Sequence, residues 1–311
     1  MRWRGQRESS NIEDRRGSGS NGGGLGGLGG LGGLGGLGGG RPRVRRGGGI
    51  GIGTILIGLV IAWLLGINPL TLLGIFSGGS GGMPMQQIQE TTRSGSPDDE
   101  LGKFVSVVLA STEDVWSAQF RAGGSQYPPP KLVLYEGGTR TACGMGSAAA
   151  GPFYCPADQR VYIDLGFYRV LHQRLGAPGD FAQAYVLAHE VGHHVQNVTG
   201  TMRQMDAWRQ SLPERAYNEK SVRLELQADC YAGVWAHHSQ QAKGWLERGD
   251  VEEGLRAAAA VGDDAMMRQS SGVVVPEAFT HGSSEQRSRW FRIGLDSGDH
   301  RRCDTFSAQR L

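Results

Sequence analysis

Residues 180–198 read DFAQAYVLAHEVGHHVQNV, and this stretch decides the fold of the chain. Its apolar residues recur at helical spacing, so it predicts an α-helix over residues 181–198. Asp180 can cap the start of this helix, and Gly200 marks its end. Apolar side chains surround the polar centre of the stretch, which indicates a helix buried in a core.

His189, Glu190 and His193 form an HExxH pattern in the middle of this helix. Residues four apart lie on one face of a helix, so both imidazoles can bind one metal ion. Glu190 adjoins that face and can reach water at the ion, where a carboxylate serves as a general base. Two surface histidines on an amphipathic helix are the alternative, because the pattern is short. The apolar surroundings favour the metal site, since a buried His–Glu–His set is costly without compensation.

A second pair of acidic residues follows on the next long helix, predicted over residues 213–238. Within LELQADCYAG, Glu225 and Asp229 are again four residues apart and have apolar neighbours. A hydrolytic zinc site needs a third protein ligand, and Glu225 is the candidate for it in a site for one Zn²⁺ per chain. Asp229 can accept the outer proton of a ligand histidine and so fix its tautomer. Two solvated acids on a helix face are the alternative.

Residues 98–311 indicate one helix-rich α+β domain with a small sheet, because about 210 residues suffice for a single core. Its first helix is capped by Asp98 or Asp99 and ends near Arg121. The other expected helices cover residues 250–261 and 284–295, and the strand candidates are residues 132–135 and 161–165.

Residues 1–49 differ in composition from everything that follows. They hold nine Arg against three acidic residues, and residues 23–39 repeat Gly-Gly-Leu. Such a tract has few side chains to bury and a high ordering entropy, so residues 1–49 predict a disordered basic tail. Because the net charge of +2 for the whole chain comes from this tail, the rest gives no case for a nucleic-acid partner.

An uncharged apolar stretch follows the tail. IGIGTILIGLVIAWLLGI, residues 50–67, is long enough as a helix to span about 27 Å, close to the hydrocarbon thickness of a bilayer. It starts too late and is too long for a cleaved signal peptide, so residues 50–76 predict one transmembrane anchor, with residues 77–97 as a linker. Arginines lie just before the stretch and none follows until Arg93, which places the N-terminus in the cytoplasm and the folded domain on the other side.

The chain has 4 Cys, all in the part placed outside the cytoplasm. An even number of cysteines in an oxidising compartment predicts that they form two disulfides. Cys143 and Cys155 are close in sequence, which favours their pairing and leaves Cys230 with Cys303, although other connectivities are open. Buried free thiols are the alternative.

Five longer segments carry a resemblance to a known family. They are RWRGQRESSNIEDRR (2–16), GPFYCPADQRVYIDL (151–165), GDFAQAYVLAHEVGHHVQN (179–197), SVRLELQADCYAGVWAHH (221–238) and FTHGSSEQRSRWF (279–291). With the single anchor, they resemble the YpfJ-type neutral zinc metallopeptidases of bacteria over nearly the whole chain. HExxH followed by ExxxD is also the gluzincin pattern of thermolysin-like peptidases, and the E-x-Q-A-D string resembles the CAAX-prenyl endopeptidase and HtpX group.

The resemblance implies a minigluzincin-like zincin domain with an HExxH active-site helix. It implies a zinc endopeptidase of the bacterial inner membrane, with its catalytic domain in the periplasm. By the same resemblance, His281 stabilises the tetrahedral oxyanion of the reaction. Arg287 stabilises the site through the acidic residues that lie behind the ligands. In gluzincins an edge strand before the HExxH helix pairs with an extended polypeptide substrate, and residues 151–155 and 160–165 are the candidates for it. The oligomeric state is left open.

The rival hypotheses are a catalytically silent scaffold or binding protein that keeps zinc for stability, and a metal-independent adaptor at the membrane. The first predicts a closed four-ligand site, and the second predicts no bound metal at all. The chain contains every residue type that zinc-dependent hydrolysis needs, which argues against the silent scaffold.

Overall fold

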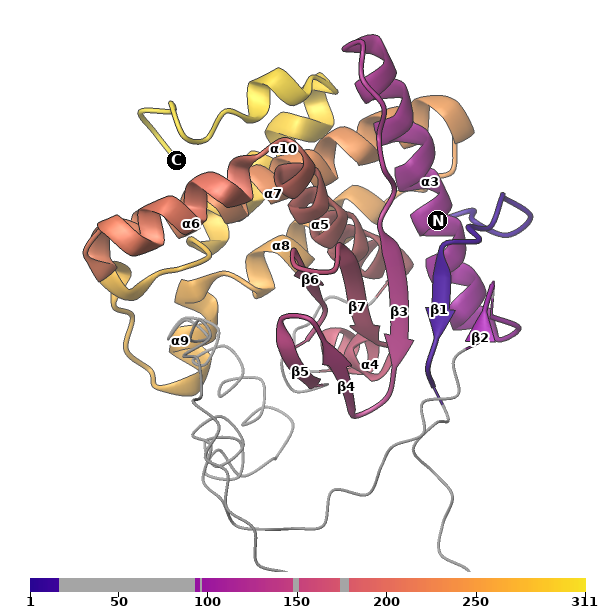
Figure 1. The fold of residues 1–311 in the computed structure, drawn as a ribbon, viewed down its shortest axis with the longest axis horizontal. Coiled ribbons are helices and arrows are strands. Elements are labelled where there is room, and N and C mark those ends of the chain that lie inside the picture. The colour runs from indigo at the N-terminus through magenta and orange to yellow at the C-terminus, as the bar shows by residue number, and fades with distance from the viewer. Residues whose placement is uncertain (17–92, 96, 148–150, 174–178) are drawn as a thin grey trace, which may run out of the picture.

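The HExxH stretch forms helix α5 (Asp180–Val198), which lies at the centre of the domain (Figure 1). The computed structural model describes residues 1–16, 93–95, 97–147, 151–173 and 179–311. Other helices pack around α5, and a small mixed sheet lies against it. The predicted α+β class is therefore confirmed.

The predicted helices form close to their expected bounds. They are α3 (Glu100–Ala122), α5, α7 (Glu214–Lys243), α8 (Asp250–Ala260) and α10 (Ser284–Ser297). Asp99 caps α3 by accepting from the backbone N–H of Gly102, whereas Gly179 rather than Asp180 occupies the N-cap of α5. Several shorter elements were not predicted: α4 (Gly166–Gln173), α6 (Thr201–Ser211), α9 (Asp263–Ser270), and the 3₁₀ helices η2 (Pro276–Ala278) and η3 (His300–Cys303).

Within the described ranges, five strands form the mixed sheet in the order β2-β1-β3-β7-β6. They are β1 (Ile12–Asp14), β2 (Arg93–Ser94), β3 (Lys131–Tyr135), β6 (Phe153–Cys155) and β7 (Arg160–Asp164). The predicted strands β3 and β7 pair in parallel, with Leu132 opposite Val161. β6 runs antiparallel to β7 and forms one edge of the sheet among the described residues. A separate hairpin of β4 (Gly138–Thr141) and β5 (Gly144–Ser147) follows β3.

Residues 1–16 are part of the folded domain, so the prediction of a disordered tail was wrong for them. β1 lies between β2 and β3, and it pairs with β3 in parallel. Trp3 and Ile12 are buried, and Trp3 packs edge-on against a phenylalanine of α3. Arg7 forms ion pairs with two acidic residues of the same helix. Composition misled the prediction, because most glycines of residues 1–49 fall after residue 16, outside the described residues.

The pairing of β1 with β3 also corrects the predicted topology. Strands of one sheet lie in one compartment, so residues 1–16 cannot be cytoplasmic while the domain lies across a membrane. The tail from residue 17, the apolar stretch 50–67 and most of the linker 77–97 lie outside the described residues. Among the helices that the structure describes, none combines the length and apolar character needed to cross a membrane.

Replacing Ile12 by Ala tests the packing of the N-terminal segment. This side chain is 2% exposed, so Ile12→Ala should lower the free energy of unfolding by about 2–4 kcal/mol. Ser10→Ala, at an exposed position of the same segment, should change it by less than about 0.5 kcal/mol. Urea denaturation measures both values. If Ile12→Ala changed the free energy of unfolding as little as Ser10→Ala does, residues 1–16 would not pack on the domain.

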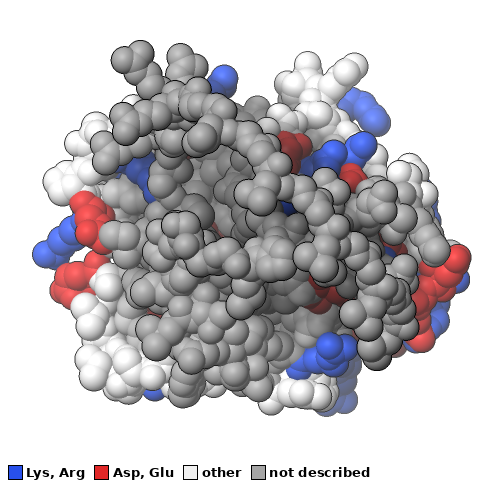
Figure 2. Space-filling view, turned by 60° about the horizontal axis from the view of Figure 1, so that its bottom comes forward, with Lys and Arg blue, Asp and Glu red and all other residues white. Residues whose placement is uncertain are grey.

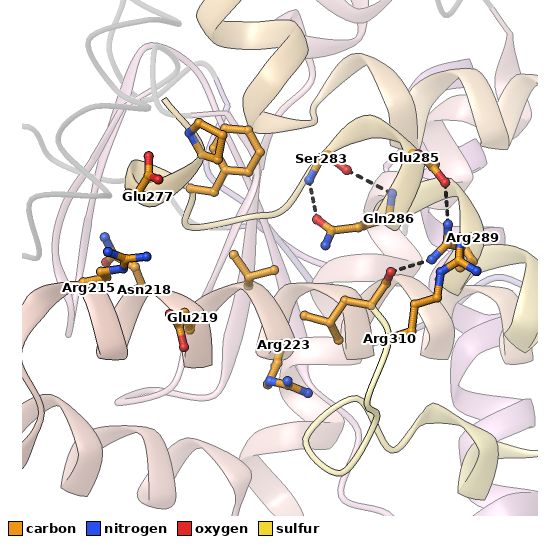
Figure 3. Close-up of a pocket in the computed structure, with 14 residues that line it drawn as sticks. Arg215, Asn218, Glu219, Arg223, Glu277, Ser283, Glu285, Gln286, Arg289 and Arg310 are labelled. Atoms are coloured by element: carbon orange, nitrogen blue, oxygen red, sulfur yellow. Dashed lines mark hydrogen bonds and ion pairs between the residues drawn. The ribbon is translucent and has the colours of Figure 1, made fainter. Parts of the chain in front are cut away.

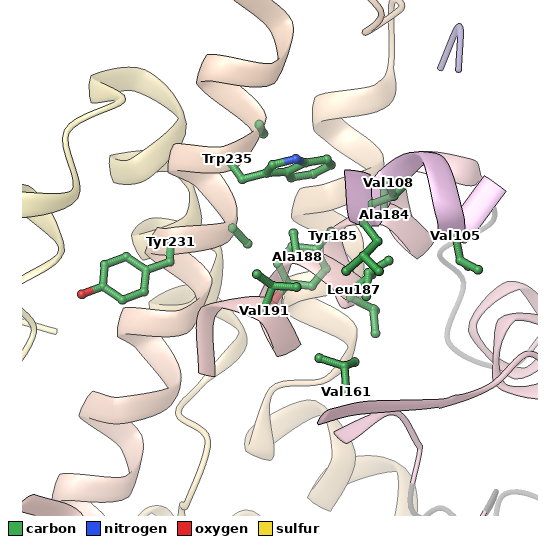
Figure 4. Packing of buried hydrophobic residues seen from close by; sticks show 14 of the residues in the cluster. Val105, Val108, Val161, Ala184, Tyr185, Leu187, Ala188, Val191, Tyr231 and Trp235 are labelled. Carbon is green, nitrogen blue, oxygen red and sulfur yellow. The ribbon is translucent and has the colours of Figure 1, made fainter. Parts of the chain in front are cut away.

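The core brings α5 and α7 into close contact. Buried residues of α3, α5, α7 and β7 belong to one cluster (Figure 4). Gly192 of α5 faces α7, and a Cβ at this position would lie 3.1 Å from the carbonyl oxygen of Ala228. Glycine therefore permits the close approach that brings the acidic residues of α7 to the histidines of α5.

The surface carries both charge signs. Around the periphery of the face in Figure 2, described Lys and Arg side chains lie beside Asp and Glu side chains. Exposed ion pairs, such as Arg4 with Glu100 and Arg16 with Asp99, join opposite charges of the N-terminal segment and α3 or its cap. Pairs of this kind add little stability, but interspersed charges keep a surface soluble.

Candidate metal centre

α5 and α7 bring together three side chains with metal-binding atoms. His189 and His193 come from adjacent turns of α5, and Glu225 faces them from α7. One ligand atom of each lies within 4.8 Å of the others. Nε2 of His189 lies 3.2 Å from Oε2 of Glu225, and Nε2 of His193 lies 3.5 Å from Oε1 of the same carboxylate. The three residues predicted as ligands therefore converge on one point.

The outer ring nitrogens of both histidines have fixed partners. Nδ1 of His189 lies 2.9 Å from Oδ1 of Asp229, and Nδ1 of His193 lies 2.8 Å from Oε1 of Gln196. Both partners are accepting oxygens, so each Nδ1 donates its proton to them. In the neutral ring, Nε2 then turns its lone pair toward Glu225, and this is the tautomer that binds a metal ion.

Gln196 was not predicted as part of the site. It is fully buried, and its Nε2 donates to the carbonyl oxygen of Leu224 at 2.7 Å and to Oε1 of Gln227 at 3.1 Å. These bonds to α7 decide which amide atom faces His193. The sequence could have predicted this contact, because Gln196 follows His193 by three residues and this spacing puts both side chains on one face of α5.

Asp229 and Arg287 form a buried ion pair behind the ligands. Nε of Arg287 lies 2.8 Å from Oδ2 of Asp229, and Nη2 lies 2.9 Å from Oδ1. The hydroxyl of Tyr185, a residue that sequence reasoning missed, donates to the same carboxylate. Burial alone raises the pKa of Asp229, but the charges of Arg287 and His189 and the hydrogen bonds from both residues together outweigh burial and keep this pKa below its usual range. The carboxylate therefore stays ionised and orients His189.

Glu190 lies between the two histidines along α5. It is only 8% exposed, and its carboxylate has no hydrogen-bond or ion-pair partner within the described part of the chain. The group is free to take a proton from a molecule that enters the site.

His281 lies in the loop before α10, and the charge of Glu225 contributes to raising the pKa of its imidazole. Its Nδ1 lies 2.8 Å from the hydroxyl oxygen of Thr280 and 3.3 Å from Oδ1 of Asp263. Oδ2 of Asp263 also accepts from three successive backbone N–H groups, those of residues 280–282. Asp263 thus fixes both the loop and the ring. It was missed because it lies 18 residues away in sequence and outside any motif.

A cavity of about 630 Å³ lies beside the first turns of α7 (Figure 3). It lies between the start of α7, η2, the start of α10 and residues 310–311. Val222, one turn before Glu225, and Phe279, two residues before His281, form part of its wall. The three ligand side chains do not line this cavity, so it does not contain the metal centre.

Both predicted disulfides are present. Cys143 pairs with Cys155, and Cys230 pairs with Cys303. The described residues contain no free cysteine, so the alternative of buried thiols and the other two connectivities are excluded. Cys230 directly follows Asp229 on α7, so the second disulfide ties this part of the site to η3.

The donor set fits zinc. Two imidazole nitrogens and a carboxylate oxygen are ligands that Zn²⁺ accepts in tetrahedral sites. Without a cation, lone pairs of Nε2 and the carboxylate oxygens of Glu225 face one another, and a proton relieves the repulsion. Burial lowers the pKa of His189, but the charge of Asp229 and the hydrogen bonds to Asp229 and Glu225 together outweigh burial and raise this pKa to about 9. The arrangement therefore calls for a positive charge at its centre.

Comparison with known proteins agrees with this chemistry. Residues 1–306 match the family described as "Putative neutral zinc metallopeptidase". The chain is 50% identical over 307 residues to the uncharacterized protein YpfJ of Escherichia coli (strain K12), which covers 98% of this chain and 99% of that protein. It is 39% identical over 269 residues to an uncharacterized protein of Mycobacterium tuberculosis, which covers 80% of this chain and 86% of the relative. No solved structure matches the chain. With its donor set and this match, the chain belongs to the neutral zinc metallopeptidase family.

Proposed function

We propose that the chain is a zinc-dependent endopeptidase with Glu190 as its general base. The observation that carries this proposal is the convergence of three ligand atoms whose outer nitrogens are already oriented. Catalytic zinc sites use three protein ligands, since these leave a fourth position for the reactants. Membership of the metallopeptidase family supports the same activity.

His189, His193 and Glu225 would hold one Zn²⁺ per chain. When bound, the ion supplies Lewis-acid polarisation of a substrate carbonyl and makes water at the site more acidic. Glu190 removes the proton of the attacking water and later passes it to the leaving amine. His281 stabilises the oxyanion that develops on the carbonyl, held in place by Asp263.

The substrate in this proposal is a polypeptide in extended form. β6 is an edge strand that pairs on one side with β7, and it packs against α5, which carries the ligands. Its other side has no paired strand among the described residues. An extended peptide can add there through backbone hydrogen bonds, which give affinity with little demand on side chains.

Loss of one ligand tests the metal site. Glu225→Ala should remove most of the zinc from the purified chain, whereas Glu219→Ala, at an exposed position of the same helix, should leave one zinc per chain. Elemental analysis gives both values, and chelation should stop peptide hydrolysis by the parent protein. Freshly prepared, folded parent protein without zinc would overturn the proposal. Zinc without hydrolysis would favour a silent scaffold.

We further propose that the domain acts in the periplasm, at the inner membrane that the apolar stretch 50–67 contacts. The two disulfides support an oxidising compartment. Because β1 belongs to the sheet, residues 1–16 share that compartment. A membrane-impermeant maleimide should therefore label Ser10→Cys and Ser125→Cys, both at exposed positions, equally in spheroplasts. Labelling of one alone would contradict the shared sheet, and labelling of neither would place both in the cytoplasm.

A further inference from the structure

His194 follows the candidate ligand His193, but it serves another part of the molecule. It lies about 100° further round α5, is 0% exposed and packs edge-on against Tyr127 and Tyr154. Its Nε2 lies 2.6 Å from the carbonyl oxygen of Pro128. Its Nδ1 lies 3.0 Å from the hydroxyl of Tyr154 on β6. Both ring nitrogens therefore bind groups outside α5.

The chemistry of the partners sets the direction of each bond. A carbonyl oxygen only accepts, so Nε2 of His194 donates to Pro128. Nδ1 is then left with a lone pair, which accepts from the hydroxyl of Tyr154. Nδ2 of Asn197, one turn further along α5, donates to the same hydroxyl at 2.8 Å. Two residues of α5 thus bind one side chain of β6, and every polar atom in the chain of bonds has a partner.

Each residue of β6 is held by a different contact. Phe153 stacks on a tyrosine of β7 with the ring centroids 5.0 Å apart, and Tyr154 is bound by His194. Cys155 is bonded to Cys143 beside the β4–β5 hairpin. A strand of three residues at a sheet edge makes few ladder hydrogen bonds of its own, so these contacts decide where it lies.

We propose that His194 is a positioning residue for peptide hydrolysis, which acts by holding β6 through Tyr154 at a fixed place relative to His193. The two histidines are consecutive, so any shift of the ligand carries the anchor of β6 with it. A peptide that pairs with β6 is thereby aligned with the metal centre. This inference rests on the proposed function and names the contact that sets substrate alignment.

Tyr154→Phe tests the contact, because it removes one hydroxyl and leaves the buried imidazole in place. Tyr162→Phe on β7 is the matched control. It also removes a hydrogen-bonded hydroxyl, here the donor to Asp158, but it keeps the ring that stacks on Phe153 and does not touch His194. Both zinc-loaded full-length variants are assayed on a ten-residue peptide and on a blocked dipeptide too short to pair along β6. Misplacement of a bound substrate by about 1 Å can cost a reaction 100-fold.

We expect Tyr154→Phe to lower kcat/KM for the long peptide about tenfold, mainly through kcat, and to change it less than about twofold for the dipeptide. Zinc content should not change, and the amides of β6 should exchange hydrogen faster than in the control. Equal effects of both variants, or equal losses on both peptides, would overturn the positioning role alone. A parent protein that binds zinc but cleaves neither peptide would overturn the proposed function, and the positioning role with it.

Discussion

Glu190→Gln should lower kcat for peptide hydrolysis by about 10²- to 10⁴-fold while the chain keeps its zinc. The substitution keeps the size of the side chain and removes its basicity, so no group remains to take the proton of the attacking water. Glu190 does not belong to the group of three converging ligand atoms, so zinc binding should be unaffected. Steady-state kinetics and elemental analysis on the same preparation give both quantities.

A matched control separates the general base from a change of charge. Glu214→Gln, at an exposed position in the first turn of α7, removes one negative charge and should leave kcat unchanged. Stability offers a second readout, because Glu190 has no hydrogen-bond or ion-pair partner among the described residues for the substitution to remove. The variant should unfold at about the same urea concentration as the parent. Loss of zinc together with activity would assign Glu190 to the ligands instead.

Arg287→Met should lower the free energy of unfolding of the metal-free domain by about 3–5 kcal/mol. Arg287 and Asp229 are 4% and 0% exposed, and methionine leaves the Asp229 carboxylate buried without its counter-charge. Zinc affinity should also fall about 10- to 100-fold, because Asp229 no longer holds His189 firmly in its metal-binding tautomer. Urea denaturation and competition with a chromophoric chelator measure the two effects.

Arg268→Met provides the comparison for this second prediction. Arg268 pairs with Asp264, four residues earlier on α9, and the Arg268 side chain is 59% exposed, so its loss should change the free energy of unfolding by less than about 1 kcal/mol. A comparably small effect of Arg287→Met would show that the ion pair behind the ligands contributes little. Unchanged zinc affinity in that variant would contradict the orienting role of Asp229.

The parts predicted well from the sequence are those specified by local periodicity. His189 and His193 lie on one face of α5 because their spacing matches the helical repeat, and the same rule places Glu225 and Asp229 together on α7. That these faces meet depends on packing, with Gly192 allowing the contact. The HExxH and ExxxD patterns indicated that these two faces meet only through their resemblance to known peptidases.

The parts that were missed depend on residues far apart in sequence. β1 has three residues, two of them charged, and becomes a strand only because β3 offers it a parallel partner. Asp263 is connected to the site by hydrogen bonds from backbone N–H groups. Such bonds cannot be predicted from the order of the side chains in the sequence. The role of Gln196 could have been inferred from its spacing of three residues from His193. A glutamine in a helix, however, usually lies at the solvent-exposed surface and does not support a metal ligand.

The position of β1 inside the sheet has a consequence for synthesis. Residues 1–16 leave the ribosome before their partner in β3, which follows more than a hundred residues later. Domains that fold during translation build from local contacts at their N-terminal end, whereas this sheet needs a long-range contact to close. The nascent segment must therefore wait, with Trp3 and Ile12 exposed to solvent or to a chaperone. The metal centre should then appear as a late event in the maturation of the chain.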